Sequence, residues 1–309
     1  MPKVLKKIVL VLLVSLPILA LIHIWSAVQN APHECSGIFR HFSTHWFIVL
    51  PVLLLTVVNW GLESMKWSRL RKIQLKQAFY EVLCGLGLAF FTPNRIGEAG
   101  GRLLSVEKND RWNSGNLFVY SSIAQSLSTV WGGLIGALFL SSSQFPIPWP
   151  LLLTLCFVVL IAGLLVYFHI QRIYRILPLP TKWKVHLNNT EKPENTLLLS
   201  VLLLSMLRYL TFSVQYLLLL HMLEPEAAIR DVLPAIGLTY LITALIPGSL
   251  LAELGYRESV GILVIGQFIN PAAVALATFI LWIINLALPA IIGSKILAHR
   301  ALKFMHGSA

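Results

Sequence analysis

The chain has 309 residues, of which 57% are hydrophobic and only 12% are charged, and its mean hydropathy is +0.76. So little charge excludes a soluble protein of this length and indicates an integral membrane protein. The net charge of +11 does not indicate nucleic acid, because the basic residues form short clusters beside apolar runs. Clusters in that position orient helices and contact anionic headgroups, so we expect no nucleic-acid partner.

Six apolar runs are long enough for helices that cross the hydrocarbon core, which takes roughly 20 residues. They cover about 8–25, 46–62, 117–140, 150–170, 197–222 and 272–296. The first run follows Lys3–Lys7 and resembles a signal peptide, but we expect an uncleaved helix because the rest of the chain is itself membrane-embedded. Two further runs, 78–93 and 232–250, are apolar but end in proline, glycine and charged residues.

The distribution of basic residues predicts the topology, because cytoplasmic loops are enriched in Lys and Arg. Residues 63–76, 171–195 and those after 296 are basic, so both termini are expected in the cytoplasm. The run 78–93 should then enter from the cytoplasm and turn back. The run 232–250 should enter from outside, with 259–269 completing its hairpin. This predicts an all-α protein with six full transmembrane helices and two re-entrant or broken hairpins, in one polytopic domain over 1–309.

The two hairpins share a sequence pattern. The first ends "PNRIGEAGGR" and the second "PGSLLAELGYR", so each has a proline followed by Glu-x-Gly-x-Arg. One copy enters from each side of the membrane, which is typical of an inverted-topology repeat. The predicted halves are about 63–140 and 229–297. Proline and glycine set the hairpin geometry through a break, a turn and close backbone approach. The residues in question are Pro93, Gly97, Gly100, Pro247, Gly248 and Gly255.

Charged residues at membrane depth indicate a structural or functional role, because inserting each one costs about 2.5–3.5 kcal/mol of free energy on insertion scales. Glu98 precedes Arg102 by four residues, and Glu253 precedes Arg257 by four, so each pair can form an ion pair on a helix. The arginines could instead present a planar fork to a phosphate. Arg208 lies near the middle of the run 197–222, with Glu98 or Glu253 as its expected partner. Headgroup contact and purely structural ion pairing both remain open.

The stretch "FFTPNRIGEAGGRLL" resembles the first signature of the lysylphosphatidylglycerol synthase transmembrane family, and "ALIPGSLLAELGYRES" resembles the second. The family signatures are a Pro-Gly-Arg-x-Gly-Glu stretch with a later Arg, and a Pro followed by Gly-x-Arg-Glu. Asn94 departs from the first, where glycine is usual. The resemblance implies a flippase-like membrane domain that moves lipids between leaflets. It adds Arg95 and Glu258 to the headgroup-binding candidates Glu98, Arg102, Arg208, Glu253 and Arg257.

Synthase members of that family also carry a soluble aminoacyl-transferase domain, for which we expect no place here because the chain ends shortly after the last apolar run. The expected activity is transport of an anionic, phosphate-bearing lipid in the cytoplasmic membrane of a prokaryote. The alternatives are a membrane enzyme acting on a lipid-linked phosphate and a non-transporting partner of an envelope-lipid pathway. The chain has only two aspartates, and its three cysteines lack ligand spacing, so no metal, cofactor or catalytic group is expected. The sequence leaves the oligomeric state open.

Overall fold

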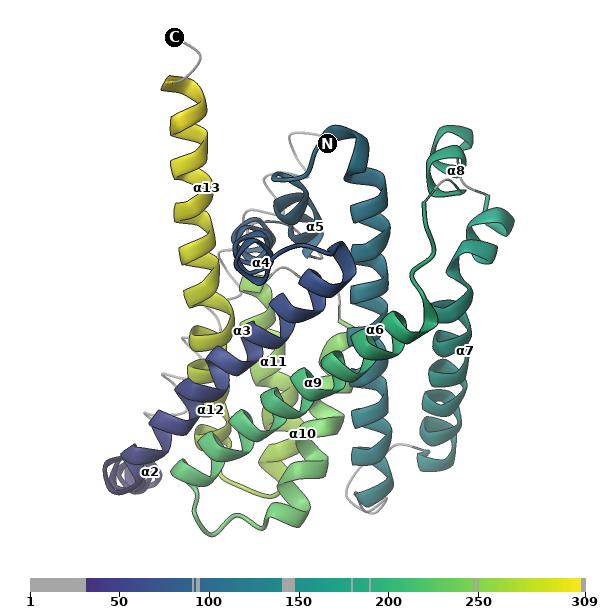
Figure 1. Cartoon of the computed structure of the whole chain (residues 1–309). Coiled ribbons are helices and arrows are strands. Elements are labelled where there is room, and N and C mark those ends of the chain that lie inside the picture. Colours follow the sequence, from purple (N-terminus) through teal and green to yellow (C-terminus); the bar gives the residue numbers. More distant parts are fainter. Residues whose placement is uncertain are drawn as a thin grey trace, which may run out of the picture.

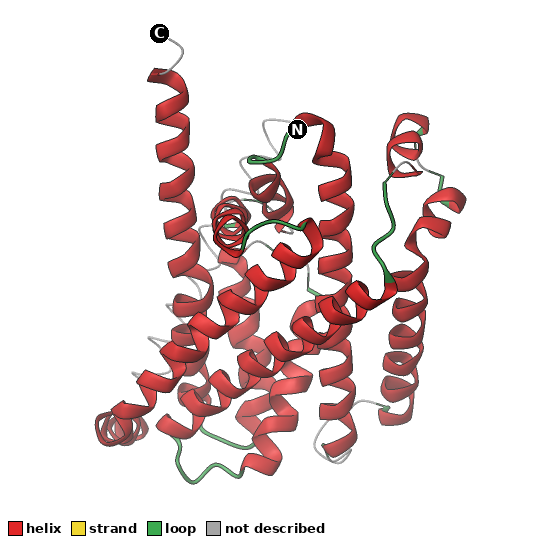
Figure 2. Ribbon diagram, in the orientation of Figure 1, coloured by secondary structure: helices red, strands yellow, loops and turns green. Residues whose placement is uncertain are grey.

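The computed structural model describes residues 32–90, 92, 95–140, 148–178, 180–188, 190–246, 248 and 250–306. Throughout these ranges the regular structure is helical, which confirms the predicted fold class (Figure 2). The predicted first span, 8–25, lies outside the described residues, as do Pro93 and Pro247.

Five helical stretches in the described part are long and apolar enough to cross a membrane. They are Arg40–Arg71, Lys108–Phe139, Trp149–Ile176, Asn195–Leu223 and Pro271–His299, and they coincide with the five predicted spans that the structure describes. They contain α3 (Val49–Arg71), α6 (Arg111–Phe139), α7 (Trp149–Ile176), α9 (Asn195–Leu223), α12 (Pro271–Trp282) and the first part of α13 (Leu288–His306). The chain is therefore a multi-pass membrane protein.

The α3 helix is longer than its apolar run, which ended at residue 62. It continues without a break to Arg71 and ends where Lys72 adopts a left-handed conformation. The added turns carry Glu63 and Lys66, which are both buried. The sequence placed Lys66 in a flanking basic cluster at the headgroups, and this interpretation was wrong because the helix holds it inside the protein.

Each predicted hairpin consists of two short helices. The first is α4 (Leu75–Ala89) with α5 (Ile96–Leu103), and the second is α10 (Ile229–Ala244) with α11 (Leu250–Val264). With 15 and 16 residues and a rise of 1.5 Å per residue, α4 and α10 are each about 23 Å long. This is shorter than a hydrocarbon core of about 30 Å. The piece predicted to complete the second hairpin forms the end of α11 and the 3₁₀ turn η5 (Ile265–Gln267).

The hairpins pack on helices from the opposite part of the chain. The α4 helix packs on α13, and α10 packs on α6. The α3 and α9 helices also pack together, and Figure 1 shows them running diagonally side by side. Glycines allow close contact at both hairpin crossings. Gly87 of α4 meets Gly293 of α13, and Gly237 of α10 meets Gly132 of α6.

The α8 helix (Thr181–Asn188) and the last turns of α13, which are both predicted to be cytoplasmic, lie at the top in Figure 1, and α2 (Pro32–His45) lies at the bottom. The basic segment 171–195 contains the last turns of α7 and the whole of α8. The imidazole ring of His186 stacks on the Trp112 ring at 4.8 Å between centroids, so a tertiary contact holds this short helix.

The α4–α13 crossing gives a stability prediction. A Cβ atom on Gly87 would lie 2.7 Å from the carbonyl carbon of Gly293 and from the backbone nitrogen of Ser294. Gly87→Ala should therefore separate the helices and destabilise the protein by about 1–3 kcal/mol, as overpacking typically does. The measurement is the thermal unfolding midpoint of detergent-solubilised protein.

Gly61→Ala is the matched control, because a Cβ at Gly61 meets nothing within 4 Å. Alanine is a better helix former than glycine by about 1 kcal/mol, so this control should keep or raise the midpoint. An equal midpoint for the two variants would contradict the close crossing.

Candidate functional site

The first signature sits on α5, which is fixed to the end of α4. The Thr92 hydroxyl donates to the Leu88 carbonyl at 3.0 Å and accepts from the Gly97 backbone N–H at 2.8 Å. A Cβ on Gly97 would lie 2.5 Å from the Leu88 carbonyl oxygen, so glycine is needed for this approach. Gly100 faces open space, whereas Gly101, which was not among the predicted hairpin residues, packs on the Cys84 backbone.

The carboxylate of Glu63 on α3 is the centre of the charged residues. It lies 2.8 Å from Lys66 Nζ, 2.7 Å from Arg102 Nη2 and 3.1 Å from Arg208 Nη1. The cations come from three elements, since Lys66 is on α3, Arg102 on α5 and Arg208 on α9. One buried carboxylate therefore joins two membrane-spanning helices and the first signature.

Arg102 extends this cluster to the rest of the first signature. Its Nη2 also donates to Glu98 Oε1 at 2.6 Å, and Arg95 Nη2 lies 3.1 Å from Glu98 Oε2. The Arg102 guanidinium stacks over the rings of Trp67 and Phe118, 5.1 and 5.2 Å from their centroids. Its side chain is only 1% exposed. The predicted pair of Glu98 and Arg102 is thus confirmed, in a larger arrangement than the sequence indicated.

We call this arrangement the Glu63 network. Its members are Glu63, Glu98, Lys66, Arg95, Arg102 and Arg208. Four positive charges face two negative ones, which leaves an excess of two positive charges inside a membrane protein. Lys66 is 2% exposed, whereas 36% of the Arg95 side chain is accessible, so the network opens towards Arg95.

Arg95 also has an unusual backbone. Its φ of 55° lies in the left-handed region, which non-glycine residues adopt at a cost. It precedes α5 directly, so this conformation turns the chain from α4 into the signature helix. Strain of this kind is concentrated at functional sites.

The second signature lies on α11 (Leu250–Val264). Glu253 and Arg257 form the predicted ion pair, and the Arg257 guanidinium lies over the Tyr240 ring at 5.5 Å. The charge of Arg95 is within electrostatic reach of Glu253 and Tyr256. A Cβ on Gly248 would lie 2.7 Å from the Tyr256 ring, and Gly255 is inside α11. The two signatures are more than 140 residues apart in the chain, yet the fold brings Arg95 of the first within electrostatic reach of Glu253 of the second.

Glu258, the last residue of the second signature, differs from the other carboxylates. Its side chain is buried, with 2% of the residue exposed. Neither of its carboxyl oxygens has a hydrogen-bond partner among the described residues. Across the same residues, no three His, Cys, Asp or Glu side chains lie together as a metal-binding group.

A chain of polar side chains leads from the Glu63 network deeper between the helices. Arg208 Nε donates to Asn59 Oδ1 at 2.9 Å, and Asn59 Nδ2 donates to Asn285 Oδ1 at 2.8 Å. Asn285 Nδ2 then donates to Gln215 Oε1 at 3.3 Å, and Gln215 Nε2 donates to Thr56 Oγ1 at 2.8 Å. Asn285 lies in a π-helical turn, Ile283–Ala287, and such turns are frequent at functional sites.

Arg208 is deep in α9 as predicted, but its predicted partner was wrong. The nearest carboxylate is Glu63, not Glu98 or Glu253. Glu63 was not among the predicted site residues, because it follows the apolar run and its position resembles the start of a loop. The one available signal was the spacing of Glu63 and Lys66, three residues apart on what proved to be a continuing helix.

Comparison with known proteins identifies the family. The sequence model of the lysylphosphatidylglycerol synthase TM region matches residues 8–293. The chain belongs to this family. No curated protein matches the chain. The match covers nearly the whole chain, including both signatures, and it confirms the resemblance that the two motifs suggested. The family relates to membrane lipids, which is consistent with lipid partners for this chain.

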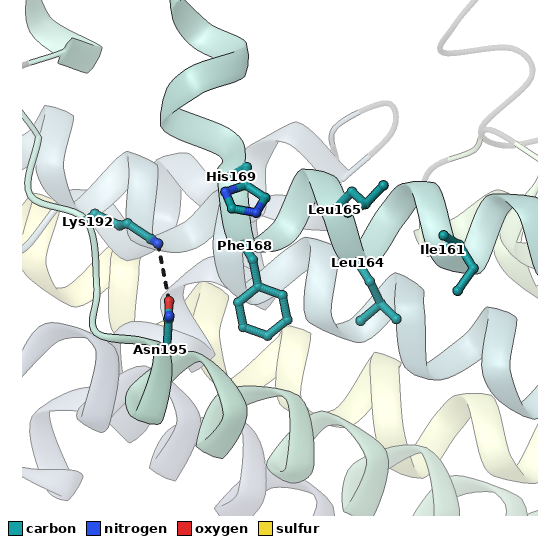
Figure 3. A pocket seen from close by; sticks show the side chains of 7 residues that line it. All are labelled: Ile161, Leu164, Leu165, Phe168, His169, Lys192 and Asn195. Atoms are coloured by element: carbon teal, nitrogen blue, oxygen red, sulfur yellow. Dashed lines mark hydrogen bonds between the residues drawn. The ribbon is translucent and has the colours of Figure 1, made fainter.

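This family member also has a groove on its surface, away from the signatures. Figure 3 shows it beside a kink in α7 at His169, where φ is −124° and ψ is 20°. The volume is about 370 Å³. The lining residues are Ile161, Leu164, Leu165, Phe168, His169, Lys192 and Asn195. Lys192 Nζ donates to Asn195 Oδ1 at 3.2 Å. None of these residues belongs to the Glu63 network.

The position of Glu63 gives a second prediction. Glu63→Gln removes the shared carboxylate and leaves three cations beside one another. Breaking a buried ion pair costs about 3–5 kcal/mol, so the thermal unfolding midpoint in detergent should fall strongly. Glu107→Gln is the control, because it makes the same chemical change at an exposed residue. Similar midpoints for both variants would show that Glu63 does not hold the helices together.

Proposed function

We propose that this protein is a lipid transporter, which moves an anionic lipid or a lipid-linked headgroup between the membrane leaflets. The excess of two positive charges in the Glu63 network, which contains the first signature and lies within electrostatic reach of the second, supports this proposal. Uncompensated charge is unfavourable inside a membrane. An anionic phosphate group would compensate it and would match the planar donors of arginine.

The accessible arginines are the proposed headgroup contacts. Arg95 has a side chain 36% exposed, and that of Arg208 is 16% exposed. Arg102 is fully enclosed and already bonds two carboxylates, so it acts as a positioning residue. The proposed site also includes Glu98, which pairs with Arg95 and Arg102, and the pair of Glu253 with Arg257. The acyl chains would stay in the surrounding lipid while the headgroup passes between the hairpins.

An inverted repeat would explain how the site opens to each side. If the two halves are exchanged, the packing of α4 on α13 corresponds to the packing of α10 on α6. The α3 and α9 helices, which precede the first and second hairpins, then exchange places, so their mutual contact is preserved. In transporters with such repeats, the halves move against each other around a site near the middle of the membrane. We therefore propose that the two hairpins open in turn.

The proposed location is the cytoplasmic membrane of a prokaryote, with both termini on the cytoplasmic side. The C-terminal end carries Lys295, Arg300 and Lys303, and α8 at the same end of the molecule carries Lys182 and Lys184. Basic residues of this kind favour the cytoplasmic side.

Transport is tested with protein reconstituted in liposomes that contain NBD-labelled phosphatidylglycerol. Dithionite bleaches the outer leaflet, so the loss of the protected half measures movement between leaflets. Arg95→Gln should slow this movement at least about tenfold, since a hydrogen bond to a charged group contributes about 1.5–3 kcal/mol and tenfold corresponds to about 1.4 kcal/mol. The thermal midpoint should be nearly unchanged.

The control variant is Arg230→Gln, because the Arg230 side chain is 88% exposed on α10 and outside both signatures. The control lipid is NBD-labelled phosphatidylcholine, whose headgroup has no net charge and should move more slowly. If wild-type protein moved neither lipid, the transporter proposal would fail, and a non-transporting role in a lipid pathway would replace it.

A further inference from the structure

Glu258 has a buried carboxyl group with no cation bonded to it among the described residues. Its neighbour Arg257 forms an ion pair with Glu253 instead, and the Arg257 guanidinium lies over the Tyr240 ring. Both Glu258 oxygens lie inside the protein with no hydrogen-bond partner among the described residues. The sequence grouped Glu258 with the headgroup-binding residues, but an ionised carboxylate at this position would repel an anionic phosphate.

The groups that face Glu258 do not supply a positive charge either. From α9, the Tyr216 ring is within electrostatic reach, and its hydroxyl is bonded to Thr278 Oγ1 at 2.6 Å. From α10, the Tyr240 ring contacts α11 because the Arg257 guanidinium lies over its face. The sequences of α12 and η5, which also pack on α11, contain no charged residue. On α11 itself, the titratable residues nearby are Glu253, Tyr256 and Arg257.

A carboxylate in such surroundings loses its hydration without gaining a compensating charge, which is far more costly than burying a neutral carboxyl. The geometry points to Glu258 as a proton-binding site, which holds a proton in this conformation and exchanges it with water when the second hairpin opens. The carboxyl group gives its proton to water and becomes a carboxylate, and it takes a proton back before the hairpin closes.

This inference rests on the proposed transport function in one respect, namely that proton exchange at Glu258 is coupled to headgroup movement. The Glu63 network includes the first signature and would bind the anion, whereas Glu258 belongs to the second signature and would bind the proton. Because closure of the second hairpin requires a neutral Glu258, a proton gradient across the membrane would bias the direction in which the hairpins alternate. The proton site itself does not depend on transport.

Infrared spectroscopy of the purified full-length protein tests the proton site without any transport. A protonated carboxylic acid has a C=O stretching band that a carboxylate lacks. Wild-type protein at neutral pH should show this band, and it should disappear as the pH is raised. Glu258→Gln should lack the band, Glu258→Asp should shift it, and Glu107→Gln, at an exposed residue, should leave it unchanged.

The proton site is refuted if wild-type protein lacks the band or if Glu258→Gln keeps it. A band that responds to sodium chloride at fixed pH would equally refute it, because it would show that the carboxylate binds a metal cation. The wild-type titration remains informative even if Glu258→Gln fails to fold.

Coupling is tested in the liposomes with NBD-labelled phosphatidylglycerol, with and without an imposed pH gradient. The ratio of the two rates should differ from one in wild type and should be close to one in Glu258→Gln. A ratio of one in wild type would refute the coupling. If wild-type protein shows the infrared band but moves no lipid, the transport function fails while the proton site stands, so the two failures can be told apart.

Discussion

A buried carboxylate in a membrane protein must be surrounded by positive groups, and Glu63 meets this constraint by contacting three cations at once. Since these cations come from α3, α5 and α9, satisfying one charge fixes the relative position of three elements. In a medium of low dielectric constant, such contacts are strong and their loss is costly. The first signature is therefore attached to the membrane-spanning helices by charge, and its glycines allow α5 to come close enough to α4 for this to occur.

The same constraint explains why the Glu63 network is accessible from one side, at Arg95. The cations exceed the carboxylates in the Glu63 network, and they differ in accessibility. Arg102 and Lys66 are enclosed, but Arg95 is partly open and lies within electrostatic reach of Glu253 of the second signature. An incoming anion would thus meet Arg95 first and would lie between the two hairpins. Glu258 shows the opposite condition, a buried acid without a cation, which is consistent with neutrality rather than ion pairing.

The sequence predicted much of the fold, because apolar length and basic clusters reflect the membrane directly. The five spans in the described residues, the two short hairpins and the pairs of Glu98 with Arg102 and Glu253 with Arg257 were all predicted from local spacing. The Glu63 network was not, because Arg208 and Glu63 are far apart in the chain and a single sequence contains no sign of their contact. Lys66 was misplaced for a related reason, since hydropathy cannot show that a helix continues beyond its apolar run.

Electron cryo-microscopy of the wild-type protein in nanodiscs that contain phosphatidylglycerol would show most directly whether the Glu63 network binds an anionic phosphate group. We expect density for a phosphate group within hydrogen-bonding distance of Arg95 and Arg208, with acyl chains extending into the surrounding lipid. Lipid density confined to the outer surface, with water alone beside these arginines, would rule out this binding site and would assign the Glu63 network to structural ion pairing.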